Sequence, residues 1–549
     1  MAKIRFSGVS FHYTSPYRSV FNNLELELDC SWHTGAVGLN GRGKTTFLRL
    51  ISGALDPVKG AIVSELPVAY FPFDTDDWNR SVRECALSML YPYRRIWAKI
   101  EELLADGSEK ALSEYTLLED QFRNAGGYDI DVRLEREVTA LGFSPDILTR
   151  SFATLSPGEK TRLMIAGLFL QKDVYPLIDE PTNHLDTAGR EIVAAYLKSR
   201  QGFLCVSHDR RFLENCTDHT LAFEKTGVEI HLHGFAEWDS ARMMKTASEE
   251  KRNEKIKRTI VKLESAERQR RGWSDKQEMN KYNGNNDVGN NKGAIGHKAA
   301  KMMKQALVIK RRKLEEIEEK KGLLLNIDKE YRIKIPVAEK IPEVLVRADS
   351  IFFSYDGFEI LRDFRLEVRK GMRLALSGTN GSGKSTLIRI LLGELKPATG
   401  DIYFPRHLSV SVCRQENSWR DGSFMEYLKT KKLDFDQFRL ILGCLGIKGD
   451  LSAKVPGDFS EGEMRKIELA GSLVSPAHLF IWDEPLNYMD MPARERIEEA
   501  VIESSPTMIF VEHDAVFTQR IATDVLDLDE LKNKQAIGKT RPLQINSPG

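Results

Sequence analysis

The chain of 549 residues is too long for one hydrophobic core, and its 41% apolar and 29% charged residues are typical of a globular protein with several domains. No window approaches the roughly 20 uninterrupted apolar residues of a membrane span, and the N-terminus lacks the apolar stretch of a signal peptide, so we expect a cytoplasmic protein. Lys and Arg, 80 in all, balance 80 Asp and Glu, but residues 241–321 hold 23 basic and 12 acidic residues, which favours a polyanionic partner.

The six cysteines lie far apart and include no Cys-x-x-Cys pair. A zinc site or a disulfide framework normally needs clustered or regularly spaced cysteines. We therefore predict buried, reduced thiols.

The first motif along the chain is a glycine-rich loop at residues 38–45, between a short apolar strand and a helix-like run. In such a loop the backbone N–H groups and the following helix N-terminus bind phosphate oxygens. We therefore predict that Lys44 reaches the β- and γ-phosphates of a nucleotide and that the hydroxyl of Thr45 binds Mg²⁺.

Residues 80–125 are rich in Arg, Lys, Glu, Leu and Ala. This composition predicts a helical arm that projects from the first domain and turns near residues 105–108. An ordinary surface elaboration is the alternative.

Three further motifs follow at residues 155–159 (Leu-Ser-Pro-Gly-Glu), 178–186 and 207–209. An apolar strand ends at Asp179, which is placed to hold Mg²⁺, and at Glu180, which is placed to polarise the attacking water. His208 ends another apolar run and suits contact with the γ-phosphate. A lone histidine is more often structural, but this one follows the acidic pair at a spacing that recurs later in the chain.

Residues 241–325 follow as a basic segment in which apolar residues recur at steps of four and three on both sides of an Asn- and Gly-rich stretch. The spacing predicts two long helices packed as an antiparallel hairpin, with a tip loop at about 272–296. A plain tether is the alternative. Aromatic residues at the tip could stack on bases or cap the hairpin. The candidate RNA-contacting residues of the tip are Arg271, Trp273, Lys276, Lys281, Tyr282, Lys292 and Lys298.

Each motif of the first set recurs in the same order in the second half of the chain. The glycine-rich loop is displaced by 340 residues and the later motifs by 304 or 305, so about 36 extra residues lie in the first copy, where the arm is expected. The sequence therefore predicts a duplicated domain. We place the copies at 1–240 and 326–530, the linker at 241–325, and a short disordered tail at 531–549.

The Ser-x-Gly-Glu elements at 156–159 and 460–463 resemble the signature of the ATP-binding cassette superfamily. In that family the signature of one domain closes over the ATP held by the other domain. The resemblance implies an α/β fold with two P-loop ATP-binding cassette domains joined by the helical-hairpin linker. It also implies an ATPase with ATP and Mg²⁺ as ligands, whose two cassettes pair within a monomer.

The resemblance assigns site residues as follows. The first site combines Gly38, Asn40, Gly41, Gly43, Lys44, Thr45, Thr46, Asp179, Glu180 and His208 with Ser460, Gly462 and Glu463. The second site combines Gly378, Asn380, Gly381, Gly383, Lys384, Ser385, Thr386, Gln415, Asp483, Glu484 and His513 with Ser156, Gly158 and Glu159. The implied catalytic residues are Glu180, Glu484, His208 and His513, and the implied Mg²⁺ ligands are Thr45, Asp179, Ser385, Gln415 and Asp483. Asp186 and Asp490 match the loop that couples the sites. Tyr13 and Tyr355 match the aromatic residue that stacks on adenine, although isolated aromatics usually belong to the core.

The two copies depart from the family pattern in different ways. Only the second half has the expected glutamine, Gln415, whereas the first half reads Tyr-Phe-Pro-Phe-Asp at 70–74. Pro157 and Glu461 replace the central signature residue, and Pro176 removes a backbone donor within an expected central strand. Since both copies keep the lysine, the glutamate and the histidine, we expect two unequal sites that both hydrolyse ATP.

Tandem cassettes could power a membrane transporter, a DNA-repair machine or a translation factor. The first needs membrane segments and the second very long coiled coils, so we expect neither a membrane nor a DNA partner. Two cassettes joined by about 80 basic residues, with the continuation Asp-Glu-Pro-Thr-Asn-His-Leu-Asp at 179–186, resemble the ABC-F family. That resemblance implies binding to the exit site of the 70S ribosome, where the linker reaches the P-site tRNA and the peptidyl-transferase centre of the 23S rRNA.

The long linker tip and the Phe-Pro-Phe sequence at 71–73 resemble the Lsa-type antibiotic-resistance branch of that family. This resemblance favours ribosome protection against lincosamide, pleuromutilin and streptogramin A drugs, with ATP hydrolysis driving release. A housekeeping factor that relieves stalled ribosomes is the alternative, and an ATPase subunit of an ABC transporter is a more remote one.

Overall fold

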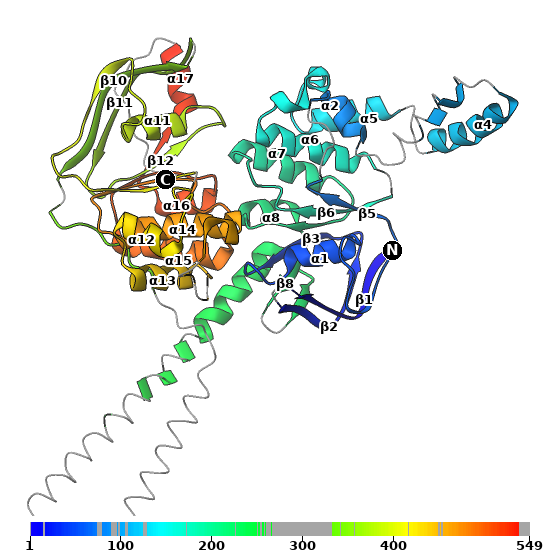
Figure 1. Cartoon of the computed structure of the whole chain (residues 1–549), viewed down its shortest axis with the longest axis horizontal. Coiled ribbons are helices and arrows are strands. Elements are labelled where there is room, and N and C mark those ends of the chain that lie inside the picture. The colour runs from blue at the N-terminus through cyan, green and yellow to red at the C-terminus, as the bar shows by residue number, and fades with distance from the viewer. Residues whose placement is uncertain are drawn as a thin grey trace, which may run out of the picture. The chain divides into compact units, whose positions relative to one another are not determined.

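The computed structural model of the chain divides into two compact units, Met1–Phe235 with Arg332–Gly549, and Ala236–Tyr331 (Figure 1). We refer to residues 1–235 as the first cassette and to residues 332–536 as the second. The structure describes residues 2–265 and 332–536, except for 15–16, 74–78, 89–95, 97–98, 101, 105–107, 125–128, 172, 225–226, 250, 253–254, 257, 260–264, 341, 356, 416, 448, 450 and 452–453.

The first cassette contains an antiparallel sheet in the order β2-β1-β4 and a larger sheet in the order β5-β6-β7-β3-β8-β9. The strands of the larger sheet pair in parallel except for β9, and β7 is buried along its whole length, as expected for a strand covered on both faces. The strands are β1 (Lys3–Thr14), β2 (Tyr17–Asp29), β3 (His33–Gly38), β4 (Lys59–Ser64), β5 (Val68–Phe71), β6 (Tyr175–Asp179), β7 (Phe203–Val206), β8 (His219–Phe223) and β9 (Val228–His231).

Helices of the first cassette follow the strands that carry the motifs. In Figure 1, α1 follows β3 after the short glycine-rich loop, and α7 and α8 follow β6 and β7 in the chain. The helices are α1 (Lys44–Ile51), α2 (Val82–Ser88), α4 (Glu109–Asn124), α5 (Ile130–Ala140), α6 (Pro157–Phe169), α7 (Thr187–Lys198) and α8 (Arg210–Cys216), with short 3-10 turns at Pro145–Thr149 and Phe152–Thr154.

The second cassette repeats this plan, with an antiparallel sheet in the order β11-β10-β13 and a parallel sheet in the order β14-β15-β16-β12-β17. Its strands are β10 (Val344–Tyr355), β11 (Phe358–Arg369), β12 (Arg373–Ser377), β13 (Thr399–Tyr403), β14 (Val410–Cys413), β15 (Leu479–Asp483), β16 (Met508–Val511) and β17 (Asp524–Asp527). Its helices are α11 (Lys384–Leu391), α12 (Phe424–Lys431), α13 (Phe435–Cys444), α14 (Glu461–Val474), α15 (Met491–Ser504), α16 (Ala515–Ile521) and α17 (Leu528–Ala536), with a 3-10 turn at Pro456–Asp458.

The core of the first cassette joins its two sheets through α1. Phe47 on α1 stacks on Phe6 of β1 with ring centroids 4.7 Å apart and meets Phe223 of β8 edge to face at 5.4 Å. Burial of such rings is worth about 1.5–3 kcal/mol each. The packing fixes the start of α1, and hence the glycine-rich loop, against the end of β3.

Four expectations from the sequence can be compared with this fold. All six cysteines, each of which the structure describes, are buried and outside disulfides, as predicted. The prediction of a disordered tail from residue 531 is wrong for residues 531–536, because α17 includes them and Leu531 packs against the core. Pro176 is accommodated because the ladder of β6 with β7 starts one residue later, at Leu177. No helix in the described residues is long and apolar enough to cross a membrane.

The predicted arm and linker are described only in part. Helices α2 and α4 lie within residues 80–125, but the expected turn includes 105–107, which lie outside the described residues. Residues 235–249 are helical. The predicted tip, including Arg271, Trp273, Lys276, Lys281, Tyr282, Lys292 and Lys298, lies outside the described residues, as do 537–549.

Candidate active site

The two glycine-rich loops have the geometry of phosphate cradles. Gly43 and Gly383, the N-cap residues of α1 and α11, have φ values of 96° and 106°. A Cβ atom at Gly43 would lie 2.4 Å from a methyl group of Val20, so the loop requires glycine there. Lys44 Nζ donates to the carbonyl oxygen of Gly38 at 2.7 Å, and Lys384 makes the same contact with its own loop at 2.8 Å. Each lysine therefore folds back over its loop.

Both loops contact the opposite cassette. The backbone N–H of Asn40 donates to Asp490 Oδ2 at 2.8 Å, and its side-chain amide donates to the carbonyl oxygen of Tyr488 at 2.9 Å. In the same way, the backbone N–H of Asn380 donates to Asp186 Oδ2 at 3.2 Å. Asp186 and Asp490 also cap α7 and α15 through their other oxygen. Each helix start is thus tied to the phosphate loop of the other cassette.

The strand-end aspartates offer an oxygen to a cation. Asp179 and Asp483 end β6 and β15, and the Oδ1 atom of each is buried without a hydrogen-bond partner among the described residues. Burial raises the pKa of both carboxyls, and hydrogen bonds from the hydroxyls of Thr45 and Ser385 oppose the rise. An orphaned carboxylate oxygen beside a hydroxyl fits Mg²⁺, which prefers oxygen ligands. Within the described part of the chain, no group of three or more His, Cys, Asp and Glu could hold a metal alone, so phosphate oxygens would complete the set.

A glutamate and a histidine face each other in both sites. Glu180 and Glu484 follow the aspartates with φ of 50° and 51°, a left-handed conformation that side chains rarely adopt and that is common at functional positions. His208 Nε2 lies 3.4 Å from Glu180 Oε1, and His513 Nε2 lies 3.4 Å from Glu484 Oε1. His208 Nε2 also lies 3.0 Å from Asn40 Oδ1.

The two glutamates differ in their electrostatic surroundings. Burial raises the pKa of Glu180 to about 7, although the charge of Lys44 opposes the rise. Burial also acts to raise the pKa of Glu484, but a hydrogen bond from His513 and the charges of His513 and Arg465 outweigh it, so that this pKa falls below its usual value. The two sites are therefore unequal in the charge of their glutamates.

Tyr70 contributes to the first site in a way that the motifs do not predict. Its hydroxyl donates to Asp179 Oδ2 at 3.0 Å. By strand register Tyr70 corresponds to Val412 of the second cassette, which has no hydroxyl. In the second site, the predicted Gln415 donates instead to Glu484 Oε2 at 3.3 Å. A phenol next to the aspartate therefore distinguishes the first site.

The predicted adenine-stacking residues lie at the ends of β1 and β10 and are partly exposed. Tyr13 is 38% exposed and Tyr355 is 40% exposed, so neither is a core residue. The hydroxyl of Tyr13 lies 3.0 Å from Thr46 Oγ1, at the start of α1. The exposed ring of Tyr13 at the mouth of the loop can stack on a base.

The signature residues begin α6 and α14. Ser156 and Ser460 are the N-caps, and each forms a capping box with the glutamate three residues later, Glu159 or Glu463. The side chains of Glu159 and Glu463 therefore cap the helix N-termini. A Cβ atom at Gly158 would lie 2.9 Å from a backbone carbonyl of its own cassette and 3.6 Å from the side-chain amide of Asn380, so the second signature–loop pair is in close contact.

A cavity of about 370 Å³ brings together most of the residues predicted for the first site, but Gly38, Ser460 and Glu463 do not line it. Its walls come from both cassettes and include Gly462, Tyr488 and Arg494 of the second. From the first cassette the walls include Tyr13, Asn40, Gly41, Gly43, Lys44, Thr45, Thr46, Asp179, Glu180 and His208. The equivalent loop of the second cassette, with Gly378, Gly381 and Thr386, repeats the backbone path of the first, as Gly381 has φ 83° against 74° at Gly41.

The comparisons with known proteins agree with this geometry. A family model described as "ABC transporter" matches residues 21–183 and 361–487. The chain is 26% identical over 542 residues to ABC transporter F family member 5 of Arabidopsis thaliana, covering 93% of this chain and 74% of that protein. It is 26% identical over 536 residues to the energy-dependent translational throttle protein EttA of Escherichia coli strain K12, covering 94% and 90%.

Among solved structures, the fold is similar to that of the archaeal ribosome recycling factor aABCE1, solved in complex with the archaeal ribosomal stalk protein aP1. The TM-score is 0.54 at 19% identity, covering 95% of this chain and 87% of that chain. At this identity the likeness describes the fold alone.

Proposed function

The chain belongs to the ABC transporter family of ATP-binding cassettes and is an ATPase, and we propose that its ATP cycle controls binding to the ribosome. The observation that carries this proposal is the similarity to EttA, a translational throttle protein by name, over nearly the whole of both chains. The surplus of basic residues in 241–321 supports it, since a cationic segment favours RNA and gives binding that weakens with salt.

Each ATP site draws its residues from both cassettes. In the first, Lys44 and the loop would hold the phosphates, Glu180 would polarise the attacking water, and His208 would contact the γ-phosphate. Ser460, Gly462 and the helix start of α14 would close over the same nucleotide. Asn40 hydrogen-bonds to Asp490 of the second cassette. ATP binding at the first glycine-rich loop would therefore change a contact that the second cassette makes.

The Mg²⁺ ion would be held by Asp179 and Thr45 in the first site, and by Asp483, Ser385 and Gln415 in the second. When bound, it neutralises charge on the β- and γ-phosphates. The residues of this chain supply the rest of the chemistry. They orient the phosphates, hold Glu180 or Glu484 near the attacking water, and exclude solvent by pairing the cassettes.

For the ribosomal task, we infer that the linker at 241–325 reaches the P-site tRNA and the peptidyl-transferase centre of the 70S ribosome, and that hydrolysis releases it. The resemblance of the tip and of residues 71–73 to the Lsa-type branch supports a protective role against lincosamide, pleuromutilin and streptogramin A drugs. A housekeeping role at stalled ribosomes is the second candidate, favoured by the similarity to EttA. Both roles place the protein in the cytoplasm.

The first experiment traps the ATP-bound form. Glu180→Gln with Glu484→Gln removes both carboxylates but keeps their shape, so ATP binds and is not hydrolysed. We expect this variant to co-sediment with 70S ribosomes in ATP and to slow growth. The matched control is Glu191→Gln with Glu503→Gln, two surface glutamates on α7 and α15 that are about half exposed. Absence of the trapped variant from the ribosome fraction overturns the ribosomal proposal.

The second experiment separates the two ribosomal roles. The wild-type chain is expressed in a drug-sensitive host, and susceptibility to the three drug classes is measured. Protection predicts a raised inhibitory concentration for at least one class, which the Lys44→Ala/Lys384→Ala variant does not give. Unchanged susceptibility to all three classes, with intact ribosome binding, favours the housekeeping role.

A further inference from the structure

Two arginines occupy equivalent positions in the repeat and belong to none of the predicted motifs. Arg190 lies four residues after Asp186, and Arg494 lies four residues after Asp490. Their side chains are only 11% and 9% exposed. A buried guanidinium is costly unless it is paired and hydrogen-bonded, so the contacts of these arginines indicate their role.

Within its own cassette each arginine ties two loops together. Arg494 Nε donates to the carbonyl oxygen of Met489 at 3.1 Å, and Nη1 pairs with Asp514 Oδ2 at 2.9 Å. Arg190 makes the matching contacts, at 3.1 Å to the backbone and at 2.7 Å to Asp209 Oδ2. Each arginine thus joins the loop before its own helix to the residue that follows the site histidine.

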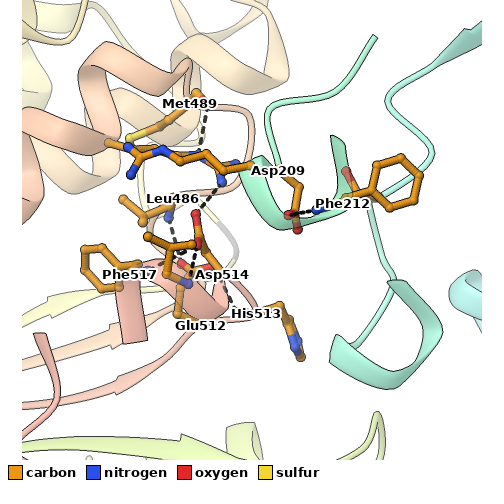
Figure 2. Close-up of polar contacts among 12 residues, drawn as sticks. Asp209, Phe212, Leu486, Met489, Glu512, His513, Asp514 and Phe517 are labelled. Carbon is orange, nitrogen blue, oxygen red and sulfur yellow. Dashed lines mark hydrogen bonds and ion pairs between the residues drawn. The ribbon is translucent and has the colours of Figure 1, made fainter. Parts of the chain in front are cut away.

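Both arginines also act across the cassette pair. Arg190 Nη1 donates to the backbone carbonyl of His513 at 3.1 Å. Arg494 lines the cavity of the first site, together with Glu180 and His208. Figure 2 shows the segment of the first cassette that carries Asp209 beside His513 and Asp514 of the second. The second cassette therefore delivers a cation to the first ATP site.

The charge of Arg494 acts on the histidine at the centre of that site. Burial lowers the pKa of His208 well below its usual value, and the positive charges of Lys44 and Arg494 lower it further. The cation supplied by the second cassette therefore favours a neutral histidine in the first, where His208 Nε2 lies 3.4 Å from Glu180 Oε1.

We propose that Arg494 is a positioning residue of the first ATP site, supplied in trans by the second cassette, and that Arg190 serves the second site in the same way. Arg494 holds Glu180 and His208 in the arrangement for hydrolysis only while the cassettes are paired. Arg190 does so through the backbone of His513. This assignment concerns the ATPase itself and does not depend on the ribosomal role.

If Arg494 had a structural role only within the second cassette, its substitution would impair the second ATP site and not the first. If Arg494 acted only through Asp514, it would support the neighbouring His513, which belongs to the second site. The site that loses activity when Arg494 is changed therefore distinguishes the two explanations.

The test measures ATP hydrolysis by the full chain in two backgrounds. Glu484→Gln leaves the first site as the active one, and Glu180→Gln leaves the second. In the first background we expect Arg494→Gln to lower kcat at least about tenfold with little change in KM, because an interaction made mainly in the transition state is lost. In the second background we expect a change of less than about threefold. Arg190→Gln should show the reverse pattern.

Two additional variants keep the test informative if Arg494→Gln folds poorly. Arg494→Lys keeps the charge but not the two-pronged geometry, and should recover part of the lost kcat. Arg494→Gln with Asp514→Asn removes the stranded carboxylate and should keep the same site preference. Vanadate trapping of 8-azido-ADP, followed by identification of labelled peptides from each cassette, reports the sites separately in a chain with both glutamates. A loss confined to the second site, or equal in both, overturns the proposal.

Discussion

Tyr70→Phe should weaken the response of the first site to Mg²⁺ while leaving the second site unchanged. The substitution removes only the hydroxyl that donates to Asp179 Oδ2 at 3.0 Å, and the ring remains to fill its place in β5. A hydrogen bond to a charged group contributes about 1.5–3 kcal/mol. Since each 1.4 kcal/mol or so is a factor of ten, the apparent Mg²⁺ affinity should fall roughly 10- to 100-fold.

The direction follows from the state of Asp179. The bond from Tyr70 lowers the pKa of this buried carboxyl, so its loss favours the protonated acid, which binds a cation poorly. It also frees the carboxylate to rotate, so that Oδ1 is no longer fixed towards the site. We therefore expect a higher Mg²⁺ requirement with kcat nearly restored at saturation.

The assay is ATP hydrolysis as a function of Mg²⁺ concentration in the Glu484→Gln background, with thermal unfolding as a check on the fold. The same substitution in the Glu180→Gln background is the control, since the second site has Val412 at this position. A half-saturating Mg²⁺ concentration within about twofold of the parent in the first background would refute the role of this hydroxyl.

The remaining predictions concern stability. Arg210→Ala breaks an ion pair between the cassettes, in which Arg210 lies 3.4 Å from the fully buried Glu498. The free energy of unfolding, measured with denaturant, should fall by about 2 kcal/mol. This is less than the roughly 3–5 kcal/mol expected for a buried charge left without a partner, because Arg520 still pairs with Glu498. Arg211→Ala, which removes a half-exposed pair with Glu191, should cost less than about 1 kcal/mol, and equal losses would contradict the buried-pair argument. Glu180→Gln should stabilise the nucleotide-free protein progressively as pH rises from 5 to 8. The folded pKa of Glu180, about 7, lies above the usual 4.5, so its favourable contribution is complete below 4.5 and is lost as pH rises towards 7. The stability gained by Glu180→Gln over the wild type should reach about 3 kcal/mol at most. A difference in melting temperature between variant and wild type that does not change with pH would count against the raised pKa of Glu180.

The sequence predicted the parts of the site that depend on local geometry. The loop with positive φ at Gly43 and the strand that ends at Asp179 and Glu180 each correspond to a short continuous sequence motif. Because both motifs recur, they also align the second copy with the first. The pairing of the two cassettes was predicted only from the resemblance of the Ser-x-Gly-Glu elements to the family signature. The contact of Asn40 with Asp490 agrees with that pairing.

Residues that act through space were not predictable in this way. Tyr70 lies on β5 and meets Asp179 only because β5 and β6 pair in parallel, and a tyrosine in a strand otherwise indicates core packing. Arg494 lies one turn into α15, where an arginine is ordinarily a surface residue, and only the pairing of the cassettes places it in the cavity of the opposite site. The helix α17 was missed because its contacts with the core come from two residues, Leu528 and Leu531.

The difference between the two glutamates bears on how the ATP cycle is ordered. Glu484 accepts a hydrogen bond from Asn487 at 2.7 Å and from Gln415 at 3.3 Å, and its pKa is lowered, so it is ionised at neutral pH in the nucleotide-free protein. Glu180 has a pKa of about 7 and depends on Lys44 and on Arg494 from the other cassette to favour its charged form. With the cassettes paired, the second site therefore holds an ionised glutamate, whereas the first holds a glutamate whose pKa lies near neutrality. The two sites thus enter the ATP cycle with their glutamates in different charge states.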